Sequence, residues 1–159
     1  VDRYSEAIGE VGLAGIDLLL TDLANLLRNH FPAGTQIARF GDDIFAALLP
    51  DLLPEQTREQ LTGLLKKAES HMFEISGRTV QTTLSIGVAG LGEQTSKAQE
   101  VVDRAHRCAD EIASGNAIKI FNPADELAAA ASRGAAPARR REASAAGPGA
   151  GEARMAGAW

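Results

Sequence analysis

Cysteine, long apolar runs and a leader-like start are scarce or missing in this 159-residue chain. Cys108 is the single cysteine, so the chain cannot form an internal disulfide. No apolar stretch reaches the roughly 18 residues that a membrane span needs, and the first residues lack the basic and apolar pattern of a signal peptide. These absences argue against a disulfide-stabilised secreted domain and against a membrane span. We therefore expect a cytoplasmic protein.

Basic residues are also scarce over most of the chain. Residues 1–127 carry 11 Lys and Arg against 19 Asp and Glu, whereas residues 128–159 carry 5 Arg against 2 Glu. An acidic folded part argues against a nucleic-acid partner. The hydrophobic content of 45% is sufficient for one domain with a buried core.

The last segment, residues 124–159, is expected to be a disordered tail or linker. Ala, Gly, Arg, Ser and Pro dominate from Ala128 to Trp159, and no large apolar residue recurs periodically there. The Arg139–Arg141 run could contact an acidic surface, but a solvated linker is the simpler interpretation.

Hydrophobic periodicity predicts alternating helices and strands over residues 1–123. The predicted helices are Ile16–Arg28, Pro54 to about His71 and about Ala98 to Ser114, and the predicted strands are Gln36–Phe40, Ile44–Leu49, Met72–Ile75, Arg78–Ala89 and Ile118–Phe121. This order is typical of an α+β fold, in which helices flank a mostly antiparallel sheet.

The most informative segment is the predicted hairpin between Gln36 and Leu49. Gly41, Asp42 and Asp43 form a short polar sequence between two apolar strands, which is the composition of a hairpin turn. The two adjacent carboxylates could hold a divalent metal. Asp and Gly are also common in turns for conformational reasons alone, so the turn by itself leaves both interpretations open.

This hairpin resembles the GGDEF signature of diguanylate cyclases, which reads Arg-x-Gly-Gly-(Asp/Glu)-Glu-Phe. Four positions of the signature are retained, namely Arg39, Gly41, Asp43 and Phe45. Asp42 stands at the second Gly and Ile44 at the Glu. Residues 1–20 and Thr83–Ala89 match further family motifs in the family's order, so residues 1–123 are identified as a GGDEF domain. The resemblance implies the palm-like sheet of nucleotide cyclases.

The resemblance also implies a strand that precedes the chain. In the family, a central strand that carries a metal-binding Asp lies just before the position of Asp2. We therefore expect that the domain of residues 1–123 is truncated at its N-terminus. A sheet without its central strand leaves backbone groups unpaired, so we expect marginal stability.

The replacements in this chain fall on functional positions of the family. Diguanylate cyclases join two GTP molecules with the help of Mg²⁺, which prefers oxygen ligands. Ile44 has no atom that can bind a metal, and Asp42 adds a negative charge where the family's Gly lets phosphates approach. By resemblance, Ile8 replaces the guanine-reading Asn and Asp17 is its retained partner acid. Acids at Asp110 and beyond stand where the last helix of the family carries a phosphate-binding Lys.

Two acids allow two interpretations each. Asp43 could bind a metal, but on a turn we expect its side chain to cap backbone N–H groups. Asp17 could contact a guanine, but we expect a structural role in the first turn of its helix. We therefore expect no catalytic residue, no cofactor and no metal. Asp17, Gly41 and Asp43 would form a vestigial nucleotide site.

These observations predict a catalytically inactive GGDEF domain that serves as a regulatory or protein-interaction module. Its Gly-Asp-x-Ile-Phe sequence is similar to that of FimX-type GGDEF–EAL effectors of cyclic di-GMP, which implies a role in type IV pilus assembly and twitching motility. The same resemblance implies an adjoining EAL domain as partner. Other signalling proteins and a second copy of the chain are further candidate partners.

Two alternatives stay open at this point. The first is a weakly active cyclase that converts two GTP to cyclic di-GMP with Mg²⁺ held by Asp42, Asp43 and the Asp that the family carries on the preceding strand. The second is a GTP-sensing module that regulates an EAL phosphodiesterase without chemistry of its own.

Overall fold

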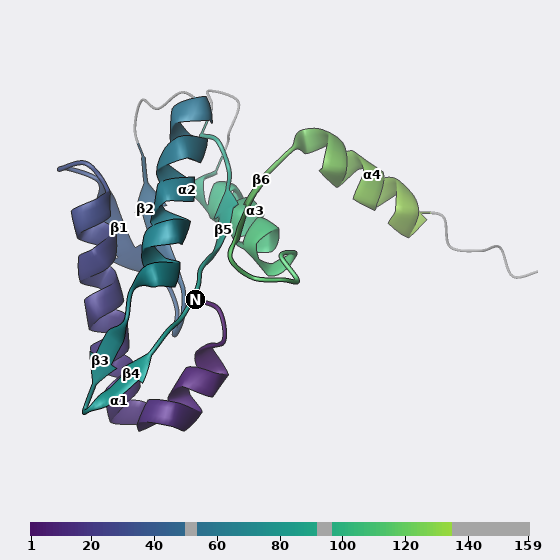
Figure 1. Ribbon diagram of the computed structural model, residues 1–159. Helices are drawn as coiled ribbons and strands as arrows, with labels where there is room; N and C mark the ends of the chain where they lie inside the picture. Colours follow the sequence, from purple (N-terminus) through teal and green to yellow (C-terminus); the bar gives the residue numbers. More distant parts are fainter. Residues whose placement is uncertain (50–53, 92–96, 135–159) are drawn as a thin grey trace, which may run out of the picture. The chain divides into compact units, whose positions relative to one another are not determined.

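The computed structural model describes residues 1–49, 54–91 and 97–134. Its elements are, in chain order, α1 (Tyr4–His30), β1 (Gln36–Arg39), β2 (Phe45–Leu48), α2 (Pro54–Ser70), β3 (Phe73–Ile75), β4 (Arg78–Val80), β5 (Ser85–Val88), α3 (Ala98–Asp110), β6 (Ala117–Ile120) and α4 (Pro123–Gly134). Figure 1 shows their course. Val1–Pro123 form one compact unit, and the chain beyond it belongs to a second. None of the helices in the described ranges combines the length and apolar character that crossing a bilayer requires.

Helix α1 supplies a large part of the core. The predicted helix over Ile16–Arg28 is confirmed, but α1 begins earlier, at Tyr4. Gly12 interrupts the helical geometry with φ 72° and ψ 176°, so α1 consists of two helical segments joined at a kink. A positive φ of this kind suits glycine, which has no Cβ to clash with the backbone.

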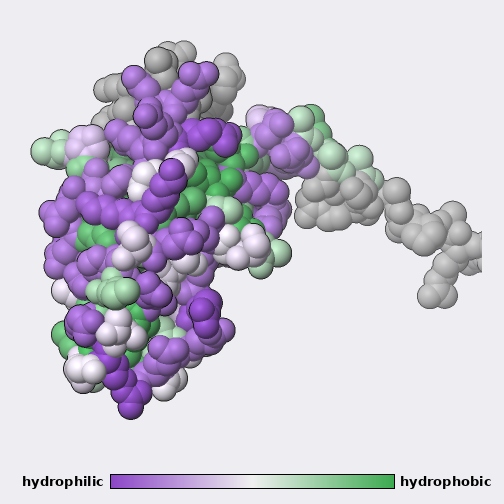
Figure 2. All heavy atoms as spheres, viewed as in Figure 1, coloured by the Kyte–Doolittle hydropathy of each residue, from purple (hydrophilic) through white to green (hydrophobic). Residues whose placement is uncertain are grey.

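The hydrophobic core joins α1, α2 and the β3–β4 hairpin. Its most deeply buried large side chains are Leu19, Leu23 and Phe73. On α2, Leu61, Leu64, Leu65 and Ala68 are buried at helical spacing, as the sequence predicted. Hydrophilic residues cover most of the face drawn in Figure 2.

The described strands form three two-stranded sheets. β1 pairs with β2 and β3 with β4, both antiparallel, whereas β5 and β6 are parallel. The α+β class and the mostly antiparallel pairing are therefore confirmed. In place of a single central sheet, however, the strands within the described ranges pair only two by two.

The predicted long strand over Arg78–Ala89 is wrong in its middle. β4 ends at Val80 and β5 begins at Ser85, so residues 81–84 belong to neither strand. Val80, Thr82 and Leu84 are nevertheless all buried. The period of two in the sequence therefore reports which side chains are buried. The backbone there binds the start of the chain, since the Asp2 N–H donates to the Thr83 carbonyl at 2.9 Å.

Residues Pro123–Gly134 form helix α4. The prediction of disorder from residue 124 onward is therefore wrong as far as Gly134. Pro123 at the first helical position and the acids Asp125 and Glu126 in the first turn favour this helix, and the alanines that follow have high helix propensity. The rest of the predicted tail, residues 135–159, lies outside the described residues.

Candidate functional site

The signature turn is the tip of the β1–β2 hairpin, as predicted. Arg39 pairs with Phe45 at the end of the ladder, and the Phe40 N–H donates to the Ile44 carbonyl at 2.8 Å. The Arg39 side chain folds back over its own turn. Its Nε donates to the Gly41 carbonyl at 3.0 Å and its Nη2 to the Asp42 carbonyl at 2.9 Å. Arg39 thus stabilises the shape of the turn.

Ile44 occupies the inner side of this turn. Its side chain lies beside Gly41, because a Cβ at that glycine would come within 3.4 Å of Ile44 Cδ1. Ile44 is half-buried and Asp42 is exposed. An aliphatic side chain therefore fills the place that the family signature gives to a carboxylate.

Asp43 is half-buried, and its main-chain carbonyl accepts a hydrogen bond of 2.9 Å from the amino group of Val1. Its carboxylate makes no hydrogen bond with any other residue that the structure describes. The prediction that the Asp43 side chain caps backbone N–H groups is therefore wrong for the residues that the structure describes. The turn takes its hydrogen bonds from Arg39 instead.

Asp17 lies near the hairpin but not in a first helical turn. α1 breaks at Gly12 and resumes at Leu13, so Asp17 is the fifth residue of the second segment and lies just past its first turn. The Asp17 carboxylate is exposed and lies 3.8 Å from Arg39 Nη1. The structure thus brings Asp17 to the arginine of the signature, while Ile8 packs against the hydrophobic core.

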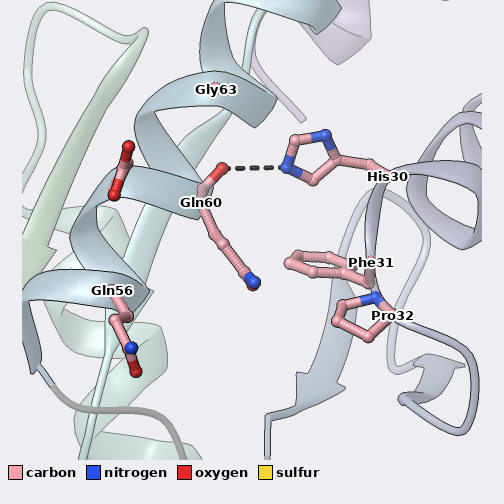
Figure 3. Close-up of a pocket in the computed structure, with 7 residues that line it drawn as sticks. His30, Phe31, Pro32, Gln56, Gln60 and Gly63 are labelled. Carbon is pink, nitrogen blue, oxygen red and sulfur yellow. Dashed lines mark hydrogen bonds between the residues drawn. The ribbon is translucent and has the colours of Figure 1, made fainter.

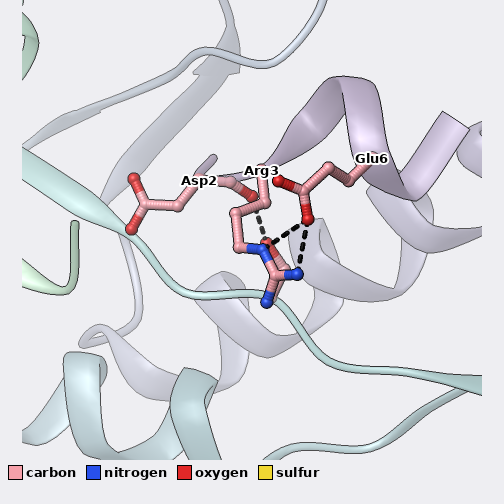
Figure 4. A network of polar contacts seen from close by, with 4 residues as sticks. Asp2, Arg3 and Glu6 are labelled. Carbon is pink, nitrogen blue, oxygen red and sulfur yellow. Dashed lines mark hydrogen bonds and ion pairs between the residues drawn. The ribbon is translucent and has the colours of Figure 1, made fainter. Parts of the chain in front are cut away.

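Asp2 is the residue that sequence reasoning missed. Its carboxylate accepts hydrogen bonds from the hydroxyl of Thr83 at 2.7 Å, from the hydroxyl of Ser85 at 2.6 Å and from the backbone N–H of Asn116 at 2.9 Å. The Asp2 carbonyl also accepts from the Thr82 hydroxyl at 2.7 Å. In Figure 4 the Asp2 side chain extends away from the neighbouring ion pair between Arg3, which precedes α1, and Glu6 in the first turn of α1.

The surroundings of Asp2 favour its ionised form. Burial of the carboxylate acts in the opposite direction, but the hydrogen bonds from Ser85, Asn116 and Thr83 together outweigh it and lower the pKa of Asp2. Gly115 has φ 68°, and a Cβ there would come within 2.8 Å of Asp2 Oδ2. Asp2 thus joins the start of the chain to β5 and to the turn before β6. In the sequence, the match of Asp2 to a family motif was the signal that could have pointed to this residue.

The acids at the end of α3 are engaged locally. Asp110 Oδ2 lies 3.5 Å from His106 Nδ1. The Lys119 ammonium on β6 donates to the Glu111 carboxylate at 2.5 Å, and this bond, followed by the lysine charge, lowers the pKa of Glu111. In this part of the chain the acids therefore contact basic side chains of the domain itself.

The carboxylates of the turn stand one position earlier than in the family signature. Ile44 offers no oxygen, and Asp42 and Asp43 are the only carboxylates of the turn itself. In the described ranges, no group of three or more His, Cys, Asp or Glu side chains could hold a metal ion. Magnesium needs an octahedral set of hard oxygen ligands, of which the protein usually supplies one or two carboxylates.

Comparisons with known proteins agree on the family. The family model described as "Diguanylate cyclase, GGDEF domain" matches residues 1–116. The probable diguanylate cyclase DgcE of Escherichia coli K12 is 30% identical over 105 residues, which make up 66% of this chain and 10% of that protein. The chain therefore spans about a tenth of the length of this curated relative.

Solved structures give the same result. The FimX GGDEF domain from Pseudomonas aeruginosa is 52% identical, with a TM-score of 0.69 over 75% of this chain and 74% of that one. The GGDEF domain of YfiN, or TpbB, from the same organism is 23% identical, with a TM-score of 0.68 over 76% and 77%. The active GGEEF domain of a Vibrio cholerae diguanylate cyclase is 16% identical, with a TM-score of 0.67 over 76% and 78%.

The YfiN and Vibrio cholerae domains are less than 25% identical to this chain, so they are evidence for its fold alone. Both have the same fold as this chain. The FimX match adds relatedness to a domain of the FimX type, as the sequence predicted. Because the family model covers most of the chain and the hairpin carries the signature at the expected place, this chain belongs to the GGDEF domain family and is related to proteins of cyclic-di-GMP signalling.

Proposed function

We propose that this GGDEF domain is catalytically inactive and acts as a regulatory or protein-interaction module in cyclic-di-GMP signalling. The observation that carries the proposal is the position of Ile44, whose side chain lies beside Gly41 where the family signature has a glutamate. An aliphatic group cannot bind Mg²⁺ or accept a proton. The chemistry of GTP condensation loses a metal ligand there.

The electrostatics of the turn support the same proposal. Asp42 adds an exposed carboxylate beside the half-buried Asp43, where a triphosphate would have to approach. Near a protein surface, two like charges about 4 Å apart repel by roughly 4 kcal/mol before salt screening. The cation of the turn, Arg39, uses two of its nitrogens for carbonyls of the turn and faces Asp17 with a third.

The wider setting is proposed by analogy. The 52% identity to the FimX GGDEF domain supports a protein of that type. We propose an adjoining EAL domain, a cytoplasmic location and a role connected with type IV pili. The residues and the fold of this domain do not by themselves identify those neighbours.

The experiment is a turnover assay on the protein that carries this domain. It is incubated with GTP and either Mg²⁺ or Mn²⁺, and cyclic di-GMP is measured by chromatography with an active diguanylate cyclase as the positive control. We expect no product above the blank. Turnover that Asp43→Ala abolishes would establish the weak cyclase instead.

Calorimetry separates the remaining alternative, a GTP-sensing module. We expect no heat of binding when GTP with Mg²⁺ is titrated into the protein at tens of micromolar. A dissociation constant in the micromolar range that Asp17→Asn or Asp43→Ala weakens would favour the sensing function over a pure interaction module.

A further inference from the structure

A small pocket lies between α1 and the β1–β2 hairpin, and the proposed function leaves it unused. Its volume is about 200 Å³. On α1, Leu20, Ala24 and Arg28 recur every four residues, so they share one helix face, and Thr21 lies beside them. Ala24 has only a methyl group, so this face of the helix is hollowed between its two larger neighbours.

The opposite wall of the pocket is one face of the hairpin. Ile37 and Arg39 are two positions apart on β1 and therefore point to the same side of the sheet. Phe45 on β2 is the cross-strand partner of Arg39 and lies on that side too. Ile37 and Phe45 are half-buried and pack against the hydrophobic core. The floor of the pocket is therefore apolar and partly accessible.

Two exposed arginines from different elements border this apolar floor. Arg28 Nη1 donates to Asn25 Oδ1 at 3.2 Å, and no ion pair joins Arg28 to another described residue. Arg39 uses Nε and Nη2 for carbonyls of the turn, and its Nη1 lies 3.8 Å from the Asp17 carboxylate. A guanidinium group has five N–H donors, so both arginines keep donors for a ligand. Among the described residues that line the pocket, none is Asp or Glu.

A larger hollow lies between the end of α1 and α2, but its polar groups are used or enclosed. Figure 3 shows the contact between His30 Nε2 and the Gln60 carbonyl, a hydrogen bond of 2.8 Å. Phe31 belongs to the core and Gln60 Oε1 is buried, so a ligand in that hollow could reach neither. The pocket beside the hairpin differs from it, because its charged side chains are exposed.

The charge at the small pocket is opposite to that of the domain as a whole. Residues 1–127 carry 11 basic against 19 acidic side chains. At physiological ionic strength, charges at the surface are screened beyond about 8 Å, so the two arginines dominate the field at the pocket itself. An anionic ligand would therefore be recognised at contact range and would not be steered from a distance.

We propose that this pocket holds a glutamate side chain from an acidic segment of a partner protein. The proposal rests on the proposed role as an interaction module and names the chemistry of the partner. Small-molecule sites usually have volumes of about 300–1,000 Å³, so this smaller pocket suits a single side chain. The two methylene groups of a glutamate can lie on the floor of Ile37 and Phe45. Its carboxylate can accept charge-assisted hydrogen bonds from the arginines.

The test is a titration of the full chain followed by two-dimensional amide NMR. The probe is the peptide acetyl-Ala-Glu-Ala-amide, and its matched control carries glutamine, which keeps the shape and loses the charge. We expect shifts centred on the second half of α1 and on β1, and at least fivefold weaker binding of the glutamine peptide. Arg28→Gln should weaken the glutamate peptide about three- to tenfold.

Arg58→Gln is the matched control variant. It removes the same charge from an exposed position of α2 outside the pocket, so the affinity should not change. Equal binding of the two peptides, or equal weakening by Arg28→Gln and Arg58→Gln, would overturn the site in favour of unspecific attraction. Because Arg28 is exposed, we expect its substitution to leave the fold intact.

Asp17→Asn gives a result of opposite sign to that of a nucleotide site. Asp17 competes with the ligand for Arg39, so its neutralisation should strengthen the glutamate peptide about two- to threefold. A GTP-sensing site would instead be weakened by the same substitution. Weaker binding of the peptide to Asp17→Asn would contradict the proposed role of Arg39.

Two further outcomes would also decide the matter. Inorganic phosphate that shifts the same amides and binds more tightly than the glutamate peptide would assign the pocket to a free anion and overturn a protein partner. Production of cyclic di-GMP would refute the proposed inactive function, whereas a glutamate peptide that fails to bind would refute only this site. The two failures are therefore distinguishable.

Discussion

The Ser85 hydroxyl donates a hydrogen bond of 2.6 Å to the Asp2 carboxylate across 83 positions of the sequence. Together with the bonds from Thr83 and from the Asn116 backbone, it ties three distant segments to one side chain. This carboxylate sits between the start of α1, the start of β5 and the turn before β6. We infer that Asp2 contributes to the stability of the domain more than any exposed acid does.

Asp2→Ala should therefore destabilise the domain. The substitution leaves two hydroxyls and one backbone N–H without their acceptor, and we expect a loss of about 2–3 kcal/mol in the free energy of unfolding. Urea unfolding followed by circular dichroism measures the change. Asp17→Ala is the matched control, because Asp17 is exposed and 3.8 Å from its partner, and should cost less than about 0.5–1 kcal/mol. Equal losses in the two variants would contradict the role of Asp2.

The same side chain should make stability depend on pH. The pKa of Asp2 is lowered in the folded state from an ordinary value of 3.8, so folding favours the ionised form. Its contribution is fully present well above pH 3.8. It is lost as the pH falls through 3.8 toward the lower folded pKa. Urea midpoints at pH 6 and pH 3.5 measure the loss, which should be smaller in Asp2→Asn. An unchanged difference between the two pH values in that variant would exclude Asp2 as the source.

How much of the fold and of the candidate site could be predicted from the sequence depended on how local each feature is. The hairpin, α2 and the burial of residues such as Leu61 follow from periodicity and turn composition within short segments. The Asp2 network links residues 81 to 114 positions apart, and no local pattern reports such contacts. The first segment of α1 was missed for a related reason, because Gly12 interrupts its apolar pattern. Asp17 lies just past the first turn of its helical segment, because that segment begins at Leu13, three residues before the predicted start.

Gly87→Ala should disrupt the contact between β5 and α3. A Cβ at Gly87 would stand 1.8 Å from the Ala105 carbonyl oxygen and 2.6 Å from the Ala109 nitrogen. These are backbone atoms of α3, so the whole helix must move away. We expect a loss of about 3 kcal/mol or more in the free energy of unfolding.

Gly90→Ala provides the comparison for Gly87. Nothing lies within 4 Å of a Cβ built at Gly90, and that residue has no positive φ. Its unfolding midpoint in urea should stay close to that of the unmodified chain. A Gly87→Ala variant as stable as Gly90→Ala would show that α3 does not rest on β5 as the structure has it.

Restoring the signature should not restore a cyclase. The double variant Asp42→Gly/Ile44→Glu rebuilds the Gly-Gly-Asp-Glu-Phe sequence, but Ile8 still packs against the core and Glu111 still pairs with Lys119. On the proposed function, base recognition and phosphate binding are lost independently of the metal ligands, so a repair confined to the turn should not recover the transition state. We expect no cyclic di-GMP from GTP with Mg²⁺ or Mn²⁺. Product formation by the double variant would mean that the turn alone had silenced the domain.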